Sequence, residues 1–351
     1  MSTPSHDAES TEGDIAAPSG ARLSGLTEGL SHKNEKGSLI LFSTSKSTDE
    51  LAELKRSIEN TSKYPVSYDE GTDRRKNGHF DLTTYSAPIR EENCEIGSVV
   101  LYGERIRSTQ DLVGSLLPVI PNGFLCVADT QTNGKGRGEN VWESPPGCLL
   151  FTFVSRFAIA NASRLPFVQY LVSLAIVEAV KRVRGCEDLD LTLKWPNDIY
   201  AGKSQKIGGV LCQSSVFRGH FEVVVGVGLN VDNDSPTTCI NGLLRDAKSD
   251  VRLSRADVLG RFCATYESMQ KDFLRNGFDP FFDAYYASWL HRDQVVRADV
   301  GDGGMQTMTV KGLAKSGALL AVDVGGNSHE LFPDGNRFDF FRGLVSRRTR
   351  R

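Results

Sequence analysis

The stretch QTNGKGRGENVW, residues 131–142, decides how the rest of this chain is interpreted. It sets three glycines around Lys135 and Arg137. An apolar, strand-like segment precedes it at residues 124–128, and a second follows at residues 149–155. Glycine lets the backbone adopt positive φ and approach a ligand closely, while the two cations supply positive charge. The loop is therefore suited to an anion, either a phosphate or a carboxylate.

Length, charge and cysteine spacing restrict the class of protein. A chain of 351 residues with 39% hydrophobic content predicts one large domain and one small one. A net charge of -3 argues against a nucleic-acid partner, which would require a basic face. We find no window of ~18 uncharged apolar residues, so we expect a soluble protein with no membrane partner. The seven cysteines are widely spaced, which predicts reduced thiols, no zinc site and a cytoplasmic location.

The two ends of the chain carry weak structural signals. Residues 1–36 are rich in Ser, Gly, Ala and Thr and contain several acids, which predicts a disordered leader. Residues 346–351 form a basic tail, for which a solvated terminus is the simplest explanation. Residues 37–97 could hold a strand at 38–43 and a helix at 49–60, but their pattern assigns no role to this region.

The pattern sharpens from residue 98, where we place a domain that runs to residue 290. Alternating or Val/Leu-rich segments predict strands at residues 189–194, 208–212 and 221–230, in a mixed or antiparallel sheet. Capping residues and apolar spacing predict helices that start near residues 166, 254 and 279. Residues 291–345 change character to short strands separated by glycine-rich turns, as in a small β-barrel.

A second motif, KWPND at residues 194–198, is followed by KIGG at residues 206–209. The oxygens of Asn197 and Asp198 are of the type that holds Mg²⁺, which takes few protein oxygens and binds substrate phosphates. Lys206 begins the next predicted strand, so a hairpin would bring its ammonium beside Asp198. We therefore expect a cation and a tentative magnesium site, with Asp198 as the metal ligand, to lie together.

Two shorter motifs complete the pattern. GVGLN at residues 226–230 has glycines that allow close approach of a ligand, and Asn230 can bond a nucleotide or a phosphate. Ser108, Thr109 and Gln110 lie at the start of a predicted helix. Taken singly, each polar residue has a simpler explanation as a helix cap or a turn residue.

In their order along the chain, the five motifs resemble the biotin protein ligases, also called holocarboxylase synthetases; they lie at residues 108–110, 131–142, 194–198, 206–209 and 226–230. The stretch VWESPPGCLLFTF and the ending PDGNRFDFF are most similar to plant-type members. The resemblance implies an α+β catalytic core of the class II aminoacyl-tRNA synthetase type, followed by a C-terminal SH3-like β-barrel. It implies that ATP, with Mg²⁺, activates biotin, and that biotin passes to a lysine of the biotin carboxyl carrier domain of carboxylases such as acetyl-CoA carboxylase. The polar N-terminal region does not fit a DNA-binding domain.

The resemblance also assigns roles to residues. Attack of a biotin carboxylate on the α-phosphate of ATP brings two anions together, so cations must neutralise them; the catalytic candidates are Lys206, Arg137 and Lys135. The family commonly has arginine where this chain has Lys135, which offers a point charge and not a bidentate fork. Expected biotin-binding residues are Ser108, Thr109, Gln110, Gln131, Lys135, Gly136, Arg137, Lys206, Gly208 and Gly209, and expected ATP-binding residues are Arg137, Trp142, Asn197, Asp198 and Asn230.

Two other functions remain open at this point. A lipoate–protein ligase or octanoyl transferase would share the fold, although Cys212 lies six residues along the strand from Lys206, about 20 Å at ~3.3 Å per residue, which is too far for a catalytic pair. A non-catalytic adaptor would bind partners through the barrel. The presence of Lys206, Arg137 and Asp198 argues against the adaptor.

Overall fold

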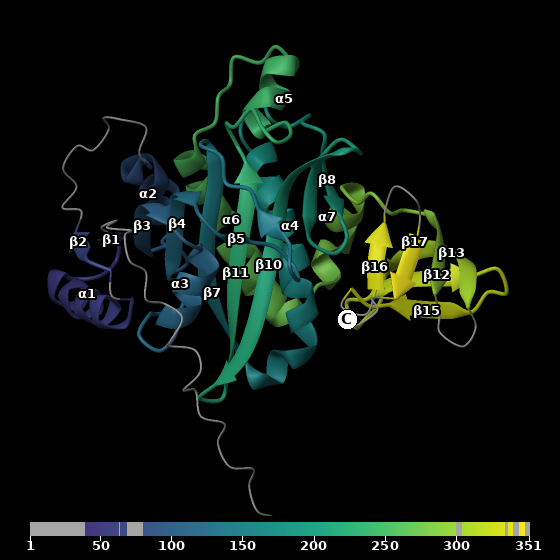
Figure 1. Cartoon of the computed structure of the whole chain (residues 1–351), viewed down its shortest axis with the longest axis horizontal. Helices are drawn as coiled ribbons and strands as arrows, with labels where there is room; N and C mark the ends of the chain where they lie inside the picture. Colours follow the sequence, from purple (N-terminus) through teal and green to yellow (C-terminus); the bar gives the residue numbers. More distant parts are fainter. Residues whose placement is uncertain are drawn as a thin grey trace, which may run out of the picture. The chain divides into compact units, whose positions relative to one another are not determined.

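The computed structural model describes residues 39–62, 64–68, 80–299, 304–333, 336–339 and 344–347. The predicted leader at residues 1–36 lies outside the described residues. Within the described ranges, the larger sheet has nine strands in the order β2-β1-β3-β4-β7-β11-β10-β9-β8 (Figure 1). Its strands are β1 Leu39–Ser43, β2 Val66–Tyr68, β3 Val99–Ile106, β4 Leu125–Gln131, β7 Cys148–Ala158, β8 Leu191–Lys194, β9 Asp198–Ala201, β10 Gln205–Phe217 and β11 His220–Asn230.

The sheet is mixed, as predicted from the sequence. β1 pairs with β2, and β3 with β4, in parallel, whereas β7, β11, β10, β9 and β8 form an antiparallel run. Two glycines, Gly209 of β10 and Gly228 of β11, are direct cross-strand partners. The predicted strands at residues 208–212 and 221–230 lie within β10 and β11.

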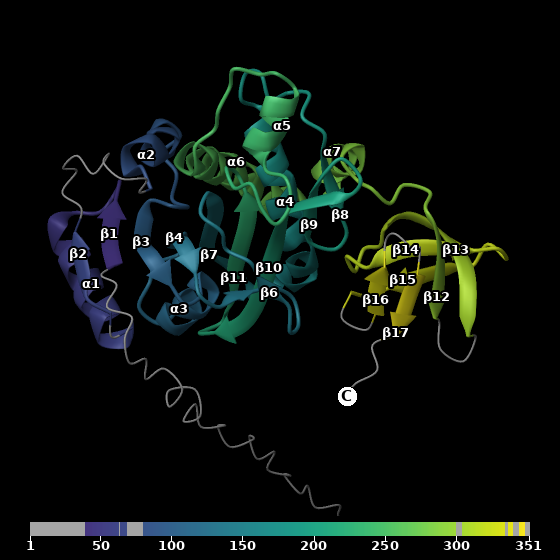
Figure 2. The ribbon, with the colours of Figure 1, turned by 45° about the horizontal axis from the view of Figure 1, so that its top comes forward.

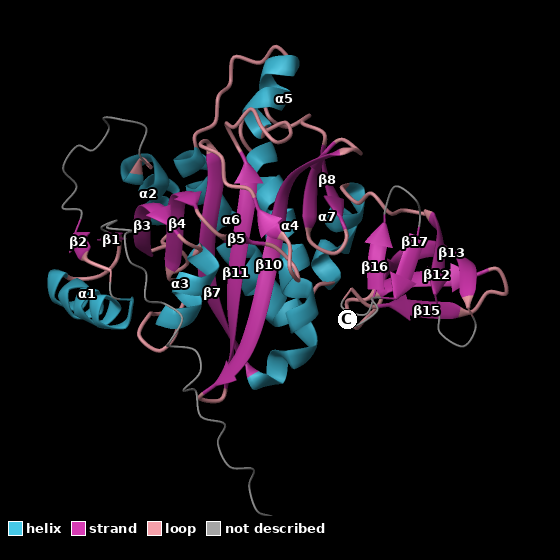
Figure 3. Ribbon diagram, viewed as in Figure 1, coloured by secondary structure: helices cyan, strands magenta, loops and turns pink. Residues whose placement is uncertain are grey.

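Helices cover both faces of this sheet. Its helices are α1 Thr48–Ser62, α2 Leu82–Glu91, α3 Thr109–Leu116, α4 Leu165–Lys181, α5 Ile240–Asp246, α6 Arg255–Asn276 and α7 Phe282–Ala287. Alternate residues of β4 point to opposite faces: Val127 belongs to the core cluster beneath α4 and α6, while Cys126 belongs to the cluster beneath α1 and α3. Figure 3 shows α4 and α6 behind β10 and β11. Because α3 packs on β4, β7 and β11, it leaves the same face of β10 uncovered by a helix.

The predicted helix starts are correct. Ser254 caps α6 by accepting the N–H of Asp257, and Pro166 lies in the first turn of α4. The third predicted helix is split into a 3₁₀ turn at Asp279–Phe281 and α7.

One segment is similar to a membrane span in length and apolar composition, which the sequence pattern did not predict. Ile159–Lys181, a 3₁₀ turn followed by α4, is long and apolar enough to pass the test for a membrane span. However, 67% of its most apolar window is buried inside the protein. Most side chains of α4 lie in the main core, so its length and apolar character are those of a central core helix.

Residues 37–97, which the sequence pattern left without a role, contribute β1 and β2 to the same sheet as the predicted domain. β1 adds to the edge of β3, with Leu41 opposite Leu101, and α2 packs against α6. The carboxylate of Glu267 in α6 accepts the backbone N–H groups of Glu95 and Ile96 at 2.7 and 2.8 Å. A buried carboxylate therefore ties the segment before β3 to the central helix layer.

The second sheet has six strands in the order β15-β14-β13-β12-β17-β16 (Figure 2). Its strands are β12 Val295–Asp299, β13 Met305–Leu313, β14 Leu319–Asp323, β15 Ser328–Leu331, β16 Asn336–Asp339 and β17 Leu344–Arg347. Ser346 and Arg347, which the sequence analysis placed in the basic tail, form part of β17, which pairs with β16. Residues 348–351 lie outside the described residues.

Replacing Glu267 with alanine tests how residues 93–97 are attached. The change leaves two buried or half-buried N–H groups without their acceptor, so we expect the free energy of unfolding to fall by about 2–4 kcal/mol. Urea denaturation measures the change, with Glu91→Ala on the exposed surface of α2 as the control. A loss for Glu267→Ala no larger than that of the control would contradict the assignment.

Candidate active site

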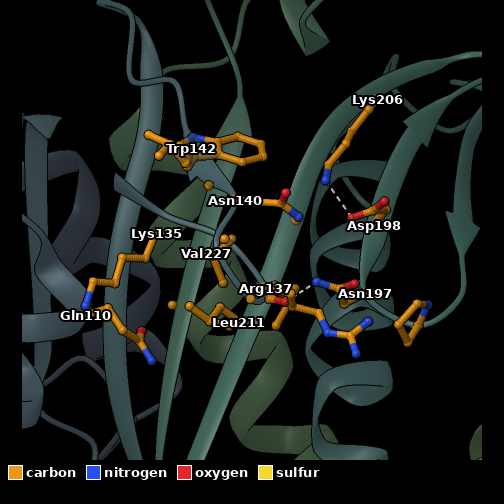
Figure 4. Close-up of a pocket in the computed structure, with 18 of the residues that line it drawn as sticks. Gln110, Lys135, Arg137, Asn140, Trp142, Asn197, Asp198, Lys206, Leu211 and Val227 are labelled. Carbon is orange, nitrogen blue, oxygen red and sulfur yellow. Dashed lines mark hydrogen bonds and ion pairs between the residues drawn. The ribbon is translucent and has the colours of Figure 1, made fainter. Parts of the chain in front are cut away.

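A cavity of about 1210 Å³ lies on the face of the sheet that carries α3, over the part of β10 and β11 that α3 leaves uncovered (Figure 4). The glycine-rich loop and the turn between β8 and β9 contribute its remaining walls. Of the predicted site residues, the cavity is lined by Thr109, Gln110, Gln131, Lys135, Gly136, Arg137, Trp142, Asn197, Asp198, Lys206 and Gly209. Gly226, Val227 and Gly228 line it as well, so residues from all five motifs meet at one place.

One end of the cavity is formed mainly by uncharged polar side chains of α3, β4 and β7. Gln131 at the end of β4 accepts hydrogen bonds from the backbone N–H and the hydroxyl of Thr109, at 2.8 and 3.1 Å. Thr152 donates its hydroxyl to Thr109 at 2.8 Å. Gln110 is 4% exposed and donates to the side chain of Gln213. These groups can exchange hydrogen bonds with a neutral, amide-like ligand.

Ser108 has a different place from the one predicted. Its hydroxyl caps α3 by accepting the N–H of Asp111 at 3.3 Å, and the side chain is buried. It does not line the cavity. Ser108 therefore fixes the start of the helix that presents Thr109 and Gln110.

The opposite end of the cavity is cationic. Lys206 Nζ lies 2.6 Å from Asp198 Oδ1, as expected for a hairpin of β9 and β10. Lys194 Nζ lies 3.4 Å from the other carboxylate oxygen. The Lys206 side chain is 40% exposed, whereas that of Asp198 is 15% exposed. The ammonium of Lys206 is therefore held in place by a carboxylate but still accessible to an anion in the cavity.

Asn197 has a structural contact next to this ion pair. Its side-chain amide donates to the carbonyl of Val210 at 2.6 Å, and the Val210 N–H donates back to the Asn197 carbonyl at 2.9 Å. The turn between β8 and β9 is thereby fastened to β10. Asn197 remains part of the cavity wall.

The donor set around Asp198 does not form a resident metal site. Both carboxylate oxygens are paired with ammonium groups, and no group of three His, Cys, Asp or Glu residues suited to a metal occurs among the described residues. A magnesium ion that entered with a nucleotide would bring its phosphate ligands with it.

The glycine-rich loop folds into a short hairpin over the cavity. β5 Gly134–Lys135 pairs with β6 Val141–Trp142, and Gly138 adopts a φ of 65° at the turn. Arg137 lines the cavity, and Figure 4 shows it beside Asn197. Lys135, by contrast, lies 2.6 Å from Asp111 of α3. In this conformation its ammonium lies at the surface of α3 and not at the end of the cavity where Lys206 lies.

Trp142 explains why glycines occur in the strands below it. A β-carbon on Gly228 would lie 2.3 Å from the Trp142 ring, and one on the opposite Gly209 would lie 3.5 Å from it. Lys206 Nζ lies 5.6 Å from the centre of the same ring. A β-carbon on Gly226 would lie 2.3 Å from the side chain of Gln110. Gly226 and Gly228 line the cavity, where the sequence pattern predicts close approach of a ligand, and in this structure they also make room for Gln110 and Trp142.

Besides Ser108, two further predicted site residues, Gly208 and Asn230, lie outside the cavity. Gly208 packs against Leu229 on the core side of the sheet. Asn230 is 3% exposed, and its amide donates to the Thr237 hydroxyl and the Thr238 carbonyl at 3.1 and 3.2 Å. A nucleotide could reach Asn230 only if the segment after β11 moved.

Several cavity residues were not selected from the sequence. Thr152 is the clearest, because it is a polar residue inside the apolar run of β7, and such a residue facing a buried sheet surface is a detectable signal. Pro333 carried no comparable signal, since it belongs to the six-stranded part of the chain.

Comparison with known proteins agrees with this geometry. The sequence model of the Biotin/lipoate A/B protein ligase family matches residues 102–230. Biotin–protein ligase 1, chloroplastic, of Arabidopsis thaliana is 43% identical over 259 residues, which cover 72% of this chain and 70% of that protein. Biotin–protein ligase 2 of the same plant is 40% identical over 282 residues, or 78% of this chain and 84% of that one.

A solved structure shows the same fold. The biotin protein ligase from Aquifex aeolicus in complex with biotin and ATP has 25% sequence identity and a TM-score of 0.53, over 66% of this chain and 94% of that chain. The α+β core and the cavity define a ligase of the biotin and lipoate class. The identities to the plant proteins are decisive within that class: this chain belongs to the biotin protein ligase family.

Substitution of Gly228 tests the packing beneath Trp142. In Gly228→Ala the new methyl group would overlap the indole, so we expect the ring to move into solvent, its fluorescence to shift to longer wavelength, and nucleotide affinity to fall roughly tenfold. Gly114→Ala is the control, because a β-carbon there has no neighbour within 4 Å. Subtracting the emission of the Trp142→Phe variant gives the contribution of Trp142. If this contribution is unchanged by Gly228→Ala, the position of the ring does not depend on this glycine.

Proposed function

We propose that the cavity binds biotin with its ring system at the Thr109–Gln131 end and its carboxylate toward Lys206. The observation that carries this proposal is the order of groups along the cavity, from uncharged hydrogen-bonding residues to the cationic end at Lys206. The ureido group of biotin is neutral and amide-like, and the apolar walls around Leu211 and Trp142 suit the thioether ring. ATP, entering as its magnesium complex, would occupy the end near Asn197 and Asp198.

Two chemical steps follow from this arrangement. A carboxylate oxygen of biotin attacks the α-phosphorus of ATP, pyrophosphate leaves, and biotinyl-AMP forms. Then the amine of a carrier lysine attacks the carbonyl carbon, AMP leaves, and the amine loses a proton. The first step brings two anions together, and Lys206 and Arg137 would neutralise them before and during attack.

Lys206 would change partner during the first step. In the structure its ammonium is 2.6 Å from Asp198, and the neighbouring Lys194 also contacts that carboxylate. When substrate anions arrive, Lys206 can turn to them while Lys194 keeps Asp198 paired. The cost of removing a partner from a partly buried carboxylate is thereby reduced.

The physiological acceptors would be biotin carboxyl carrier domains of carboxylases such as acetyl-CoA carboxylase. This follows from the family, in which biotin is the group transferred to protein. We also propose a cytoplasmic location, which the seven free cysteines among the described residues support.

The lipoate alternative is not favoured. The named relatives are biotin–protein ligases, and the apolar surroundings of Cys212 raise the pKa of its thiol to about 12. Such a thiol is protonated at neutral pH and cannot serve as the nucleophile of an octanoyl transferase. An adaptor without catalysis has no specific observation in its favour.

Calorimetry of biotin against lipoate, with and without MgATP, tests the substrate class. We expect heat with biotin and a tighter complex when MgATP is present, because the loop carrying Arg137 would order over the adenylate. Biotin-dependent exchange of pyrophosphate into ATP tests the first step. Binding of lipoate in preference to biotin would overturn the proposal.

Lys206→Ala measures how much the cationic end of the cavity contributes to the rate of adenylation. We expect kcat/KM in pyrophosphate exchange to fall by roughly 100- to 1,000-fold, the range for loss of one charge-stabilising donor. Lys203→Ala is the matched control, because this exposed lysine lies three positions away and outside the cavity. Equal activities of the two variants would remove Lys206 from the reaction.

Arg137→Gly separates formation of the adenylate from its retention. Adenylation should remain partly active because Lys206 is intact, but biotinyl-AMP should escape into solution because one contact to its phosphate is lost. Chromatography of radiolabelled product without a carrier measures the release. Arg218→Gly is the control, since Arg218 lies at the β10–β11 turn with a φ of 47° that suits glycine. A variant that neither exchanges pyrophosphate nor releases adenylate would contradict this division of roles.

A further inference from the structure

His291 lies between the last helix of the core and the first strand of the six-stranded sheet, and it is completely buried. The backbone N–H of Trp195 donates to its Nε2 at 2.9 Å. Its Nδ1 lies 2.9 Å from Oε1 of Gln294. A backbone N–H can only donate, so Nε2 is unprotonated and Nδ1 carries the proton that is donated to Gln294. The imidazole is therefore neutral and connects Trp195 to the residue that precedes β12.

A second connection starts from the same tryptophan. The indole N–H of Trp195 donates to the Tyr170 hydroxyl at 2.9 Å, and that hydroxyl donates to the carbonyl of Gly317 at 2.6 Å. Tyr170 belongs to α4, and Gly317 lies between β13 and β14. Trp195, Tyr170 and His291 are each 2% exposed or less. The two connections run from the six-stranded sheet to one tryptophan in the cavity wall.

The position of Trp195 determines what these contacts can control. It is the first residue of the turn between β8 and β9, with Lys194 immediately before it and Asn197 and Asp198 after it. Those neighbours include the carboxylate that holds Lys206. A displacement of the Trp195 backbone would therefore move Asp198 and the amide of Asn197 together, while the Thr109–Gln131 end, on α3 and β4, would stay in place.

We propose that His291 is a positioning residue for the nucleotide side of the reaction. By accepting the Trp195 N–H it fixes the position of the Lys194–Asp198 turn. Together with Tyr170, it makes that position depend on the six-stranded sheet. The inference rests on the proposed function, because it assigns ATP to this end of the cavity. It gives the small C-terminal sheet a part in the chemistry of the core, although the reacting atoms lie elsewhere.

The surroundings of His291 keep it in the form that this role requires. Burial is the main cause that lowers its pKa to about 4; the bond to Gln294 opposes the shift, and the nearby positive charge of Lys194 adds to it. Lys194 is itself paired with Asp198, and Asp293 is paired with Lys311. A protonated Nε2 would direct a hydrogen at the Trp195 N–H. The stabilisation is therefore fully present above pH ~6.5 and is lost as the pH falls toward 4.

Three variants test the proposal. His291→Leu removes the acceptor, His291→Gln keeps an oxygen near the position of Nε2 without a titrating group, and Ile58→Ala in α1 is a buried control at the opposite edge of the sheet. In biotin-dependent pyrophosphate exchange, we expect His291→Leu to raise KM for ATP at least tenfold and to change the Kd for biotin less than twofold. His291→Gln should restore KM for ATP to within about threefold of the wild type, while Ile58→Ala should change neither constant despite its lower Tm.

A second measurement covers the case in which His291→Leu does not fold. Tyr170→Phe removes the hydroxyl that joins Trp195 to Gly317, and it too should raise KM for ATP selectively. Between pH 6.5 and 4.5 the urea midpoint of the wild type should fall more steeply than that of His291→Gln, because only in the wild type does residue 291 gain a proton on unfolding.

The possible outcomes are distinct. Equal effects on ATP and biotin, failure of His291→Gln to recover ATP binding, or a rise in KM for Ile58→Ala as large as that for His291→Leu would each overturn the positioning role. Absence of biotin-dependent exchange in the wild type would instead refute the proposed function, and the pH dependence of unfolding would still report on His291.

Discussion

The site depends on a partly buried ammonium group that is held in position by a carboxylate and can still bind an anion in the cavity. Lys206 and Asp198 meet this requirement through the antiparallel pairing of β9 and β10, which brings the ammonium and the carboxylate within 2.6 Å. Asp198 keeps a second partner in Lys194. Under the proposed function, the carboxylate would hold the lysine in place before substrate arrives, and the second lysine would make the exchange of partners less costly. Most other features of the cavity serve to shape the space in front of this ammonium.

The glycines and Trp142 show how that space is formed. Gly209 and Gly228 are opposite each other on neighbouring strands, and the indole packs against both. Two side chains are absent so that one large ring can lie flat on the sheet next to Lys206. The ring connects the glycine-rich loop to the strands, so a movement of the loop would change the surroundings of Lys206.

The parts of this arrangement that depend on local contacts could be predicted from the sequence, whereas those that depend on long-range contacts could not. The proximity of Lys206 to Asp198 follows from a short hairpin, which is a local feature. The buried state of Asn230 does not, because it depends on how the segment carrying Thr237 folds back. Likewise, the pairing of Lys135 with Asp111 joins two exposed side chains from different motifs, and periodicity carries no information about such a contact. The role of residues 37–97 was hidden because β1 is defined by its long-range pairing with β3 and not by a strong local pattern.

The attachment of β1 to β3 has a practical consequence for dividing this chain. The match to the family model begins at residue 102, and a fragment cut just before β3, near residue 98, would seem to retain every catalytic group. It would nevertheless uncover the apolar edge of β3 around Leu101 and strip Glu267 of the two N–H groups that it accepts. An unprotected strand edge of this kind recruits other chains. Such a fragment would therefore precipitate through intermolecular strand pairing even though its chemistry was intact.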